Sequence, residues 1–352
     1  MAYLVLSNGA VFEGTRIGAT GDTIGELVFT TGVVGYLETL TDPSYAGQII
    51  MQTFPMIGNY GVIEEDFEGI SAAKGYVVRE LCDTPSNFRS QYALDRFLKD
   101  SGIPGICGVD TRQLTRIIRE EGVMNAIICD EVPADLSAVQ AYRVKGVVSA
   151  VSCREPGLYR ATAKKKYDVT LIDYGEKRGI LRALRARGCD VTVVPHDISA
   201  EAILASGTQG VVLSNGPGDP KDNVFEIEQI KKLIGKLPVF GICLGHQLTA
   251  LAMGGDTVKL RYGHRGANQP VRDLNGTRTY ITSQNHGYAV VPESLGDKGV
   301  VSFVNANDGS DEGVRYPERK CFTVQFHPEA CAGPIDTGFL FDRFLSLIGG
   351  DD

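Results

Sequence analysis

The chain has 352 residues, of which 43% are hydrophobic and 22% are charged, and its formal net charge is −8 at pH 7. This length suggests about two domains, and the ordinary hydrophobic content excludes a wholly disordered chain. The acidic balance argues against a general nucleic-acid binder, which needs a basic surface. Because no run of about 18 apolar residues is present, we expect no membrane-spanning helix.

The first residues of the sequence show no basic segment followed by a sustained apolar run, so we expect no signal peptide. Eight cysteines are scattered along the chain without any CxxC pair. This pattern is typical of reduced thiols, and not of a disulfide framework or a zinc site. The sequence therefore predicts a cytoplasmic protein that binds no metal and no cofactor.

The first half of the chain is predicted to form an α+β domain over residues 1–150. Asn8-Gly9 separates the apolar segments Tyr3–Leu6 and Val11-Phe12, which predicts a hairpin with a type I′ turn. Further strand-like runs are Leu27–Thr30, Gln48–Gln52 and Tyr76–Val78.

Two helices are predicted after these strands. Ser90 is a candidate N-cap before a helix with apolar residues at Leu94 and Phe97, and Asp110 with Gln113 resembles a capping box before a second helix. Strands followed by helices favour a largely antiparallel sheet in this domain.

Residues 151–167, which include Glu155-Pro156-Gly157 and a run of lysines, are predicted to be a linker. Residues 168–352 then alternate strand-like and helix-like segments. The strand-like runs are Val169–Asp173, Val191–Pro195, Gly210–Ser214 and Leu237–Ile242. This alternation predicts an α/β domain with a doubly wound, mostly parallel sheet, whose site lies beyond the carboxyl ends of the strands.

The junction at Cys243 is the most informative feature of the second half. A buried strand is predicted to end there and a helix to begin directly after it, with Gly241 and Gly245 two residues away on either side. Small neighbours at these positions are typical of a nucleophile elbow, a tight strand-to-helix turn. The helix N-terminus would also favour the thiolate form of Cys243. The alternative interpretation is a buried small hydrophobe, which we expect for the other seven cysteines.

A thiolate nucleophile needs a base, and the chain has only five histidines. His246 lies three residues into the predicted helix and should point away from the elbow. His327 ends a strand-like run and would reach the same edge of the sheet. Glu329 follows two residues later, where its carboxylate can hydrogen-bond the far imidazole nitrogen and fix its tautomer. Taken alone, this His-Pro-Glu segment could be a surface turn.

The segment Ser214–Pro220 follows the third strand-like run and is rich in glycine. Such a loop can present backbone N–H groups to an oxyanion, although a plain double turn is the alternative. It carries neither Gly-Lys-Ser/Thr nor GxGxxG, so we do not expect it to bind a nucleotide.

Three motifs, SNGPGDP (214–220), GICLGHQ (241–247) and FHPE (326–329), resemble the class I (triad) glutamine amidotransferase domain. Four more resemble the small, glutaminase subunits of carbamoyl-phosphate synthetases: DPSY (42–45), TFPMIGNYG (53–61), GVDTR (108–112) and SQNHGYA (283–289). The resemblance covers essentially the whole chain.

This resemblance implies that Cys243 is the nucleophile, His327 the base and Glu329 its orienting carboxylate. It implies hydrolysis of L-glutamine through a cysteinyl thioester, with the oxyanion held by the amide of Leu244 and a loop glycine. The implied L-glutamine contacts are Ser44, Gly216, Gly218, Leu244, Gln247, Asn285, Gly287 and Tyr288.

The resemblance also implies a partner. A large synthetase subunit would bind ATP and Mg²⁺, receive the ammonia and make carbamoyl phosphate from bicarbonate for arginine synthesis, pyrimidine synthesis or both. No ATP-binding motif is present in this chain. We therefore expect a heterodimer in which the first domain docks on the large subunit.

Two alternatives stay open. One is a stand-alone cysteine amidase or peptidase whose first domain has diverged, and it predicts turnover without a partner. The other is a non-catalytic scaffold that has kept the fold, against which the intact Cys243, His327 and Glu329 argue.

Overall fold

The computed structural model describes residues 1–330 and 332–350. The chain divides into two compact units, Met1–Lys145 and Gly146–Asp352, and each is described by itself.

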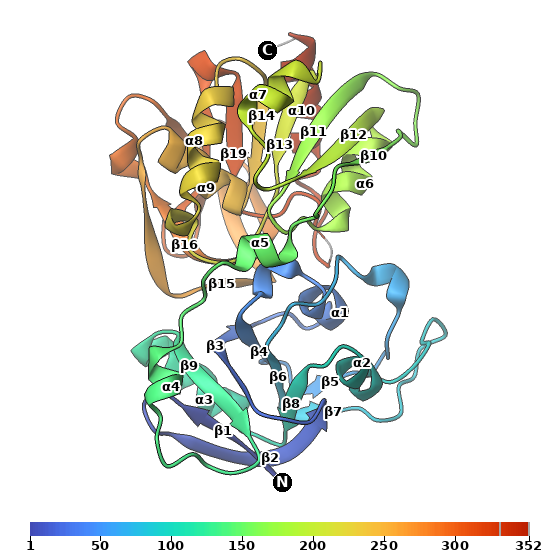
Figure 1. Ribbon diagram of the computed structural model, residues 1–352, viewed down its shortest axis with the longest axis vertical. Coiled ribbons are helices and arrows are strands. Elements are labelled where there is room, and N and C mark those ends of the chain that lie inside the picture. The colour runs from blue at the N-terminus through green and yellow to red at the C-terminus, as the bar shows by residue number, and fades with distance from the viewer. Residues whose placement is uncertain (331, 351–352) are drawn as a thin grey trace. The chain divides into compact units, whose positions relative to one another are not determined.

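The first unit is built on a closed barrel with the strand order β1-β2-β8-β6-β4-β3-β9 (Figure 1). Its strands are β1 (Ala2–Leu6), β2 (Val11–Gly18), β3 (Thr23–Thr30), β4 (Gln48–Gln52), β6 (Gly75–Val78), β8 (Pro104–Cys107) and β9 (Met124–Cys129), and β5 (Met56–Ile57) pairs with β7 (Glu80–Leu81) outside the barrel. Its helices are α1 (Tyr36–Leu40), α2 (Leu94–Asp100), α3 (Thr111–Glu121) and α4 (Ser137–Ala141), with 3₁₀ turns η1 (Pro43–Tyr45) and η2 (Glu64–Asp66).

The prediction of a largely antiparallel sheet is wrong for one side of this barrel. The β3–β4, β4–β6 and β6–β8 pairs are parallel, whereas β1 pairs antiparallel with both β2 and β9. Parallel neighbours need crossover connections. Several of these crossovers consist of helices only three to five residues long, such as η1, α1 and η2, which leave no periodic signal in the sequence.

The predicted hairpin is present, but its turn differs from type I′. β1 and β2 pair antiparallel, and Gly9 has a φ of 91°, whereas Asn8 does not have a positive φ. The N–H of Gly9 donates to the carbonyl of Leu6 at 2.9 Å, and the N–H of Leu6 donates to Ala10 at 2.9 Å. The loop therefore has three residues and needs glycine only at its last position.

One of the two predicted helix caps is correct. The carboxylate of Asp110 accepts the N–H of Gln113 at 3.0 Å at the start of α3. Ser90 is not an N-cap, because α2 begins at Leu94 after Ala93. The segment after Ser90 is held in an extended form, since the N–H of Gln91 donates to Val62 at 2.9 Å.

The second unit contains a ten-stranded sheet with the order β10-β12-β11-β13-β14-β19-β18-β17-β15-β16. Its strands are β10 (Gly157–Tyr159), β11 (Tyr167–Asp173), β12 (Cys189–Pro195), β13 (Gly210–Leu213), β14 (Val239–Ile242), β15 (Asp256–Asp273), β16 (Thr279–Val291), β17 (Val300–Asn305), β18 (Asp311–Tyr316) and β19 (Cys321–Val324). Its helices are α5 (Val147–Val151), α6 (Arg178–Ala186), α7 (Ala200–Ala205), α8 (Val224–Leu233), α9 (Leu244–Ala252) and α10 (Phe339–Gly349), with 3₁₀ turns η3 (Pro220–Asp222), η4 (Pro292–Leu295) and η5 (Pro317–Arg319).

The strands β12, β11, β13, β14 and β19 are parallel, as the alternating pattern predicted, and the remaining pairs are antiparallel. Helices cover both faces of the parallel part (Figure 1). The buried cluster on one face includes residues of α6 and α10, such as Leu184 and Phe344, and the cluster on the other includes Ile203, Ile230 and Leu248 of α7, α8 and α9. The predicted mixed α/β fold is confirmed.

Part of the stretch predicted as a linker belongs to the second unit. β10 lies within residues 151–167 and pairs antiparallel with β12 at the edge of the sheet. A three-residue edge strand is too short to show alternation in the sequence. No helix in the described part of the chain is both long and apolar enough to cross a bilayer.

Candidate functional site

Cys243 occupies a strained turn between β14 and α9. Its φ is 53° and its ψ is −103°, and it is one of three non-glycine residues with a positive φ among the described residues. A Cβ atom at Gly241 would lie 2.8 Å from the carbonyl oxygen of Gly245, and a Cβ at Gly245 would lie 2.7 Å from the Cβ of Leu213. Both positions therefore require glycine, as an elbow does.

The position of Cys243 in the sheet follows from strand pairing. β14 lies between β13 and β19, and the N–H of Cys243 donates to the carbonyl of Val324 at 2.8 Å. Cys243 thus sits at the carboxyl end of a central parallel strand, where sites form in doubly wound sheets. Its Sγ lies 3.7 Å from the carbonyl oxygen of Asn285 on β16.

His327 comes to the same end of the sheet just after β19. Its N–H donates to the carbonyl of Ser283 at 2.9 Å, so β16 holds its backbone. Its Nδ1 atom lies 2.6 Å from Oε1 of Glu329, and both side chains are buried. This contact fixes the ring and directs Nε2 to the other side, where this atom is buried and makes no hydrogen bond to the described residues.

A lysine that the sequence did not single out completes this cluster. The Nζ of Lys177 lies 3.3 Å from Oε1 of Glu329, and only 4% of its side chain is exposed. Lys177 precedes α6 in the loop after β11, and its N–H donates to Oδ1 of Asn215 at 3.0 Å. Its only signal in the sequence is its place in a loop at the carboxyl end of a strand.

These neighbours set the charge of the His327–Glu329 pair. Burial lowers the pKa of His327, but the negative charge of Glu329 outweighs burial and raises that pKa well above its ordinary value. The positive charge of Lys177 opposes this rise, whereas an interaction with Cys243 adds to it. Burial raises the pKa of Glu329, but His327 and Lys177 together bring it below its ordinary value. The pair is therefore an imidazolium and a carboxylate at neutral pH.

The glycine-rich loop Ser214–Pro220 lies beside the elbow. The N–H of Gly245 donates to the carbonyl of Ser214 at 3.0 Å. A Cβ at Gly216 would come within 2.7 Å of the Leu244 side chain, and Gly218 has a φ of 90°. Leu244 is the first residue of α9, where backbone N–H groups lack intrahelical partners. The structure thus places the glycine-rich loop against Leu244 and Gly245, directly after Cys243, and the role of their N–H groups as oxyanion donors stays a prediction.

The predicted glutamine contacts on β16 lie next to α9. The Nε2 of Gln247 donates to the carbonyl of Tyr288 at 3.0 Å and to Oε1 of Gln325 at 2.9 Å. Asn285 is buried, and Gly287 and Tyr288 are half-buried.

Ser44 belongs to the first unit, where it lies in η1 and donates its N–H to Oδ1 of Asp42 at 2.9 Å. Its contact with glutamine stays a prediction.

His246 lies on α9 and makes different contacts from His327. Its Nδ1 atom lies 2.8 Å from Oγ1 of Thr323, and its side chain is fully buried. Burial lowers the pKa of His246 to about 3, so the ring is neutral. Its contact with Thr323 and its low pKa, which makes it a weak base, do not suit it to act as the base.

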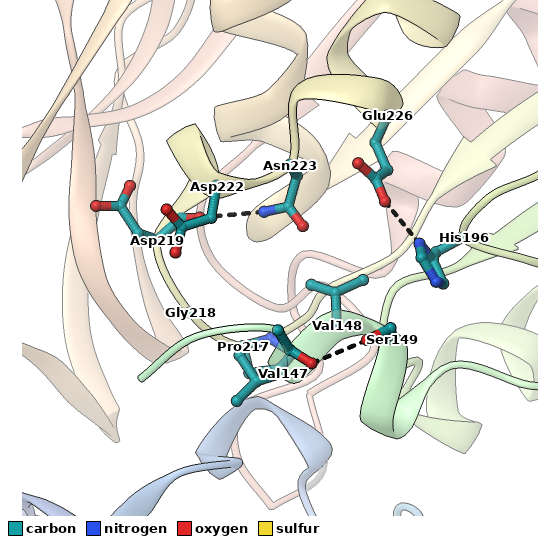
Figure 2. Close-up of a pocket in the computed structure, with 11 residues that line it drawn as sticks. Val147, Val148, Ser149, His196, Pro217, Gly218, Asp219, Asp222, Asn223 and Glu226 are labelled. Atoms are coloured by element: carbon teal, nitrogen blue, oxygen red, sulfur yellow. Dashed lines mark hydrogen bonds and ion pairs between the residues drawn. The ribbon is translucent and has the colours of Figure 1, made fainter. Parts of the chain in front are cut away.

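A pocket of about 190 Å³ lies on another side of the glycine-rich loop (Figure 2). It is lined in part by Pro217, Gly218 and Asp219, and Figure 2 shows His196 pointing toward Glu226, with 2.6 Å between Nδ1 and Oε1. None of the described residues that line it belongs to the Cys243 cluster. The pocket shares Gly218 with the predicted glutamine contacts, but Cys243, His327 and Glu329 do not line it.

Comparison with known proteins finds two matching family models. The family model "Carbamoyl-phosphate synthase small chain, CPSase domain" matches residues 4–128, and "Glutamine amidotransferase class-I" matches residues 170–347. The carbamoyl phosphate synthase small chain of Oceanobacillus iheyensis is 48% identical, with 98% of this chain and 95% of that protein covered. The corresponding protein of Listeria monocytogenes is 50% identical, with 99% and 97% covered.

The chain belongs to the carbamoyl-phosphate synthase small chain family. The predicted resemblance is confirmed, and a class I glutamine amidotransferase domain makes up most of the second unit. A solved structure, that of a glutamine amidotransferase from Thermotoga maritima, aligns with 53% of this small chain and 83% of its own length, at 17% identity and a TM-score of 0.39.

Proposed function

We propose that this small chain hydrolyses L-glutamine through a thioester on Cys243 and delivers the ammonia to a large synthetase subunit. The observation that supports this most directly is the strained Cys243 at the carboxyl end of β14, with the buried His327–Glu329 pair at the same edge of the sheet. A side chain held at a positive φ is costly, and such strain is typical of functional sites.

The reaction begins when the Cys243 thiolate attacks the carboxamide carbon of glutamine. The negative charge that develops on the oxygen is stabilised by the N–H of Leu244 and of a glycine in the loop; removing one such donor typically costs about 10²–10³-fold in rate. His327 gives its proton to the leaving nitrogen, so the C–N bond breaks and ammonia departs. A γ-glutamyl thioester remains on Cys243.

The second half of the reaction regenerates the thiolate. His327, now neutral, accepts a proton from a water molecule, and the hydroxide attacks the thioester carbon. The C–S bond breaks, glutamate leaves, and His327 is again an imidazolium. Glu329 stabilises the imidazolium throughout, and Lys177 keeps Glu329 ionised.

The substrate would be held by the residues that the family resemblance implies. The proposed glutamine contacts are Ser44, Gly216, Gly218, Leu244, Gln247, Asn285, Gly287 and Tyr288. The Gly216 and Gly218 backbones suit this role because neither position has room for a side chain without displacing a neighbour or straining the backbone.

The ammonia would pass to a large subunit that binds ATP and Mg²⁺ and makes carbamoyl phosphate from bicarbonate. This chain has no ATP-binding motif, so the partner would supply that chemistry. The product would serve arginine synthesis, pyrimidine synthesis or both in the cytoplasm, and the first unit would be the docking surface for the large subunit.

The decisive experiment compares two nitrogen donors in the reconstituted holoenzyme. Cys243→Ser should abolish carbamoyl phosphate synthesis from glutamine and leave synthesis from free ammonia intact, because only the glutaminase chemistry is removed. Cys82→Ser, which alters a half-buried thiol of the first unit, is the matched control and should retain both activities. Glutamine-dependent synthesis by Cys243→Ser would overturn the proposal.

The same preparation separates the alternatives. A stand-alone amidase would hydrolyse its substrate at full rate without a partner and would not co-purify with an ATP-binding chain. A non-catalytic scaffold would show no selective alkylation of Cys243 by iodoacetamide. The proposal requires that the large subunit co-purifies with the small chain and that Cys243 is alkylated before the other thiols.

A further inference from the structure

A second buried cluster in the amidotransferase domain joins three strands outside the elbow. His264 lies on β15, His286 on β16 and Glu312 on β18, and all three are buried. One ligand atom from each lies within 4.8 Å of the other two. None of these three residues is among the proposed catalytic or glutamine-binding residues.

The contacts of His286 leave a lone pair without a donor. A neutral imidazole has one N–H, and Nδ1 lies 2.7 Å from the carbonyl oxygen of Tyr288, which accepts that proton. Nε2 then faces Oε1 of Gln284 at 3.2 Å and Oε1 of Glu312 at 3.8 Å, which are also acceptors. Oε1 of Glu312 has a long donor contact, from Nδ2 of Asn305 at 3.4 Å, which also lies 3.4 Å from Nδ1 of His264. A cation between these acceptors would satisfy them more fully.

Glu312 adds to this need. Its Oε2 atom is buried and has no hydrogen-bond partner among the described residues. A carboxylate oxygen buried in this way costs free energy unless a proton or a cation compensates it. The amide of Gln284 cannot help, because its Nε2 donates to Oγ1 of Thr282 at 3.2 Å and its oxygen therefore faces His286.

The outer nitrogens of both histidines are arranged as they are in metal sites. A metal-binding histidine usually donates its other N–H to a carboxylate or a backbone carbonyl. Nε2 of His264 lies 2.9 Å from Oδ2 of Asp308, and Nδ1 of His286 contacts the Tyr288 carbonyl. Each ring thus points its second nitrogen toward Glu312.

The spacing of the inner atoms also fits. Nδ1 of His264 lies 3.4 Å from Oε1 of Glu312, and Nε2 of His286 lies 3.8 Å from the same oxygen. In a tetrahedral site with bonds of about 2.0–2.2 Å, ligand atoms are about 3.4 Å apart. Small movements of the side chains would therefore bring three ligands to one ion.

We propose that His264, His286 and Glu312 bind one Zn²⁺ ion, with Oε1 of Gln284 or a water molecule in the fourth position. Two imidazoles and one carboxylate suit Zn²⁺, whereas Ca²⁺ and Mg²⁺ prefer sites made of oxygen. The ion tethers β15, β16 and β18. Because Asn285 precedes His286 on β16 and its carbonyl contacts Cys243, the ion also steadies the strand beside the thiol.

The prediction that the chain binds no metal rested on the spacing of the cysteines and did not consider these three residues. These ligands are 22 and 26 residues apart, at positions 264, 286 and 312, and come from three separate strands. Local spacing therefore carries no signal for them.

The test measures metal retained by the full chain, expressed without a polyhistidine tag. After incubation with ZnCl₂ and removal of free metal by gel filtration, the wild type should retain one zinc ion per chain, and His286→Gln and Glu312→Gln should retain none. His196→Gln is the matched control, since His196 also contacts a buried carboxylate, Glu226 at 2.6 Å, and should retain zinc. Equal retention by the wild type and His286→Gln would overturn the site.

A second measurement keeps the test decisive if the variants do not fold. Wild-type protein loaded with Co²⁺ should show the visible absorption of a tetrahedral ion without the sulfur-to-metal charge-transfer band that cysteine ligands produce. Zinc should also raise the Tm of the wild type. Absence of retained metal, an octahedral spectrum or a thiolate band would each contradict the proposal.

Discussion

His327 and His246 lie in the same domain, and each ring is buried, yet their charges differ. Within the described part of the chain, His246 contacts only a neutral hydroxyl at hydrogen-bond distance, and burial lowers its pKa to about 3. His327 contacts Glu329 at 2.6 Å, and the negative charge there raises its pKa despite burial. The ring of His246 is therefore neutral and that of His327 is charged at neutral pH.

The difference does not come from the mere presence of a carboxyl group. His246 has Asp311 nearby, with 3.8 Å between Nε2 and Oδ1, but burial raises the pKa of Asp311 well above its ordinary value and so disfavours its charged form. Despite its burial, Glu329 stays ionised chiefly because of the positive charge of His327, and Lys177, which also contacts it, adds to this effect. The charge of each of these two histidines thus follows the charge state that its neighbouring carboxyl group favours.

The largest expected contrast is between matched substitutions of the two histidines. His327→Asn removes the acid and base and should lower glutamine hydrolysis by about 10²–10⁴-fold. His246→Asn should retain hydrolysis and instead lower the free energy of unfolding, since it disturbs a buried polar contact worth about 1–3 kcal/mol. Steady-state kinetics and urea denaturation of both variants check this. Equal losses of activity in the two variants would show that the proposed division of roles is wrong.

A smaller contrast concerns the pH profile. His327 must be protonated to release ammonia, so the rate should fall at alkaline pH as it loses its proton. Glu329→Gln removes the charge that raises the pKa of His327, and the alkaline limb should move to lower pH. Lys177→Met removes a charge that lowers this pKa, and the limb should move to higher pH.

Both variants should also lose rate, Glu329→Gln by about 10²-fold and Lys177→Met by about tenfold, or about 1.4 kcal/mol of activation free energy. The rate of glutamine hydrolysis measured from neutral to alkaline pH tests the directions. The two opposite displacements form the sharper test, because a general loss of folding would not move the limb both ways. If the alkaline limbs of the two variants moved in the same direction, the electrostatic account would be wrong.

Much of this site was predictable because its parts have local causes. The two glycines around Cys243 indicate the elbow in the sequence. Each is required because its backbone lies close to another residue, Gly241 to Gly245 and Gly245 to Leu213 of the adjacent strand. His327 and Glu329 follow a strand and are close in sequence, so their pairing needed no long-range information. The parallel strands from β11 to β14 each showed a short apolar run.

The parts of the site and of the fold that were not predicted depend on contacts between segments far apart in the sequence. Lys177 has the sequence of an ordinary loop lysine, and its burial against Glu329 results from folding over more than 150 residues. The paired strands β15 and β16 have 18 and 13 residues. Register shifts in β15, between Lys259 and His264 and between Gly266 and Gln269, interrupt the alternation of buried and exposed side chains. A sequence pattern cannot show such a strand.

The smallest expected effects concern the neutral histidine. Thr323→Val removes the hydroxyl that contacts Nδ1 of His246 at 2.8 Å and should cost about 1–3 kcal/mol of unfolding free energy, because a buried nitrogen loses its partner. The double variant His246→Leu/Thr323→Val should be more stable than the sum of the single changes predicts, since both polar groups are then gone. Additive losses would mean that the two groups are not coupled.

The pH dependence of this coupling follows from linkage. The folded state of the wild type does not protonate His246, whose pKa is about 3, whereas the unfolded chain binds a proton near the ordinary value of 6.5. Unfolding therefore takes up a proton below that pH, and His246 makes the wild type less stable as pH falls. His246→Leu lacks this penalty, so its deficit relative to the wild type should shrink from about pH 8 to about pH 5 in urea denaturation. A deficit that grows toward pH 5 would mean that His246 is charged in the folded protein, as His327 is.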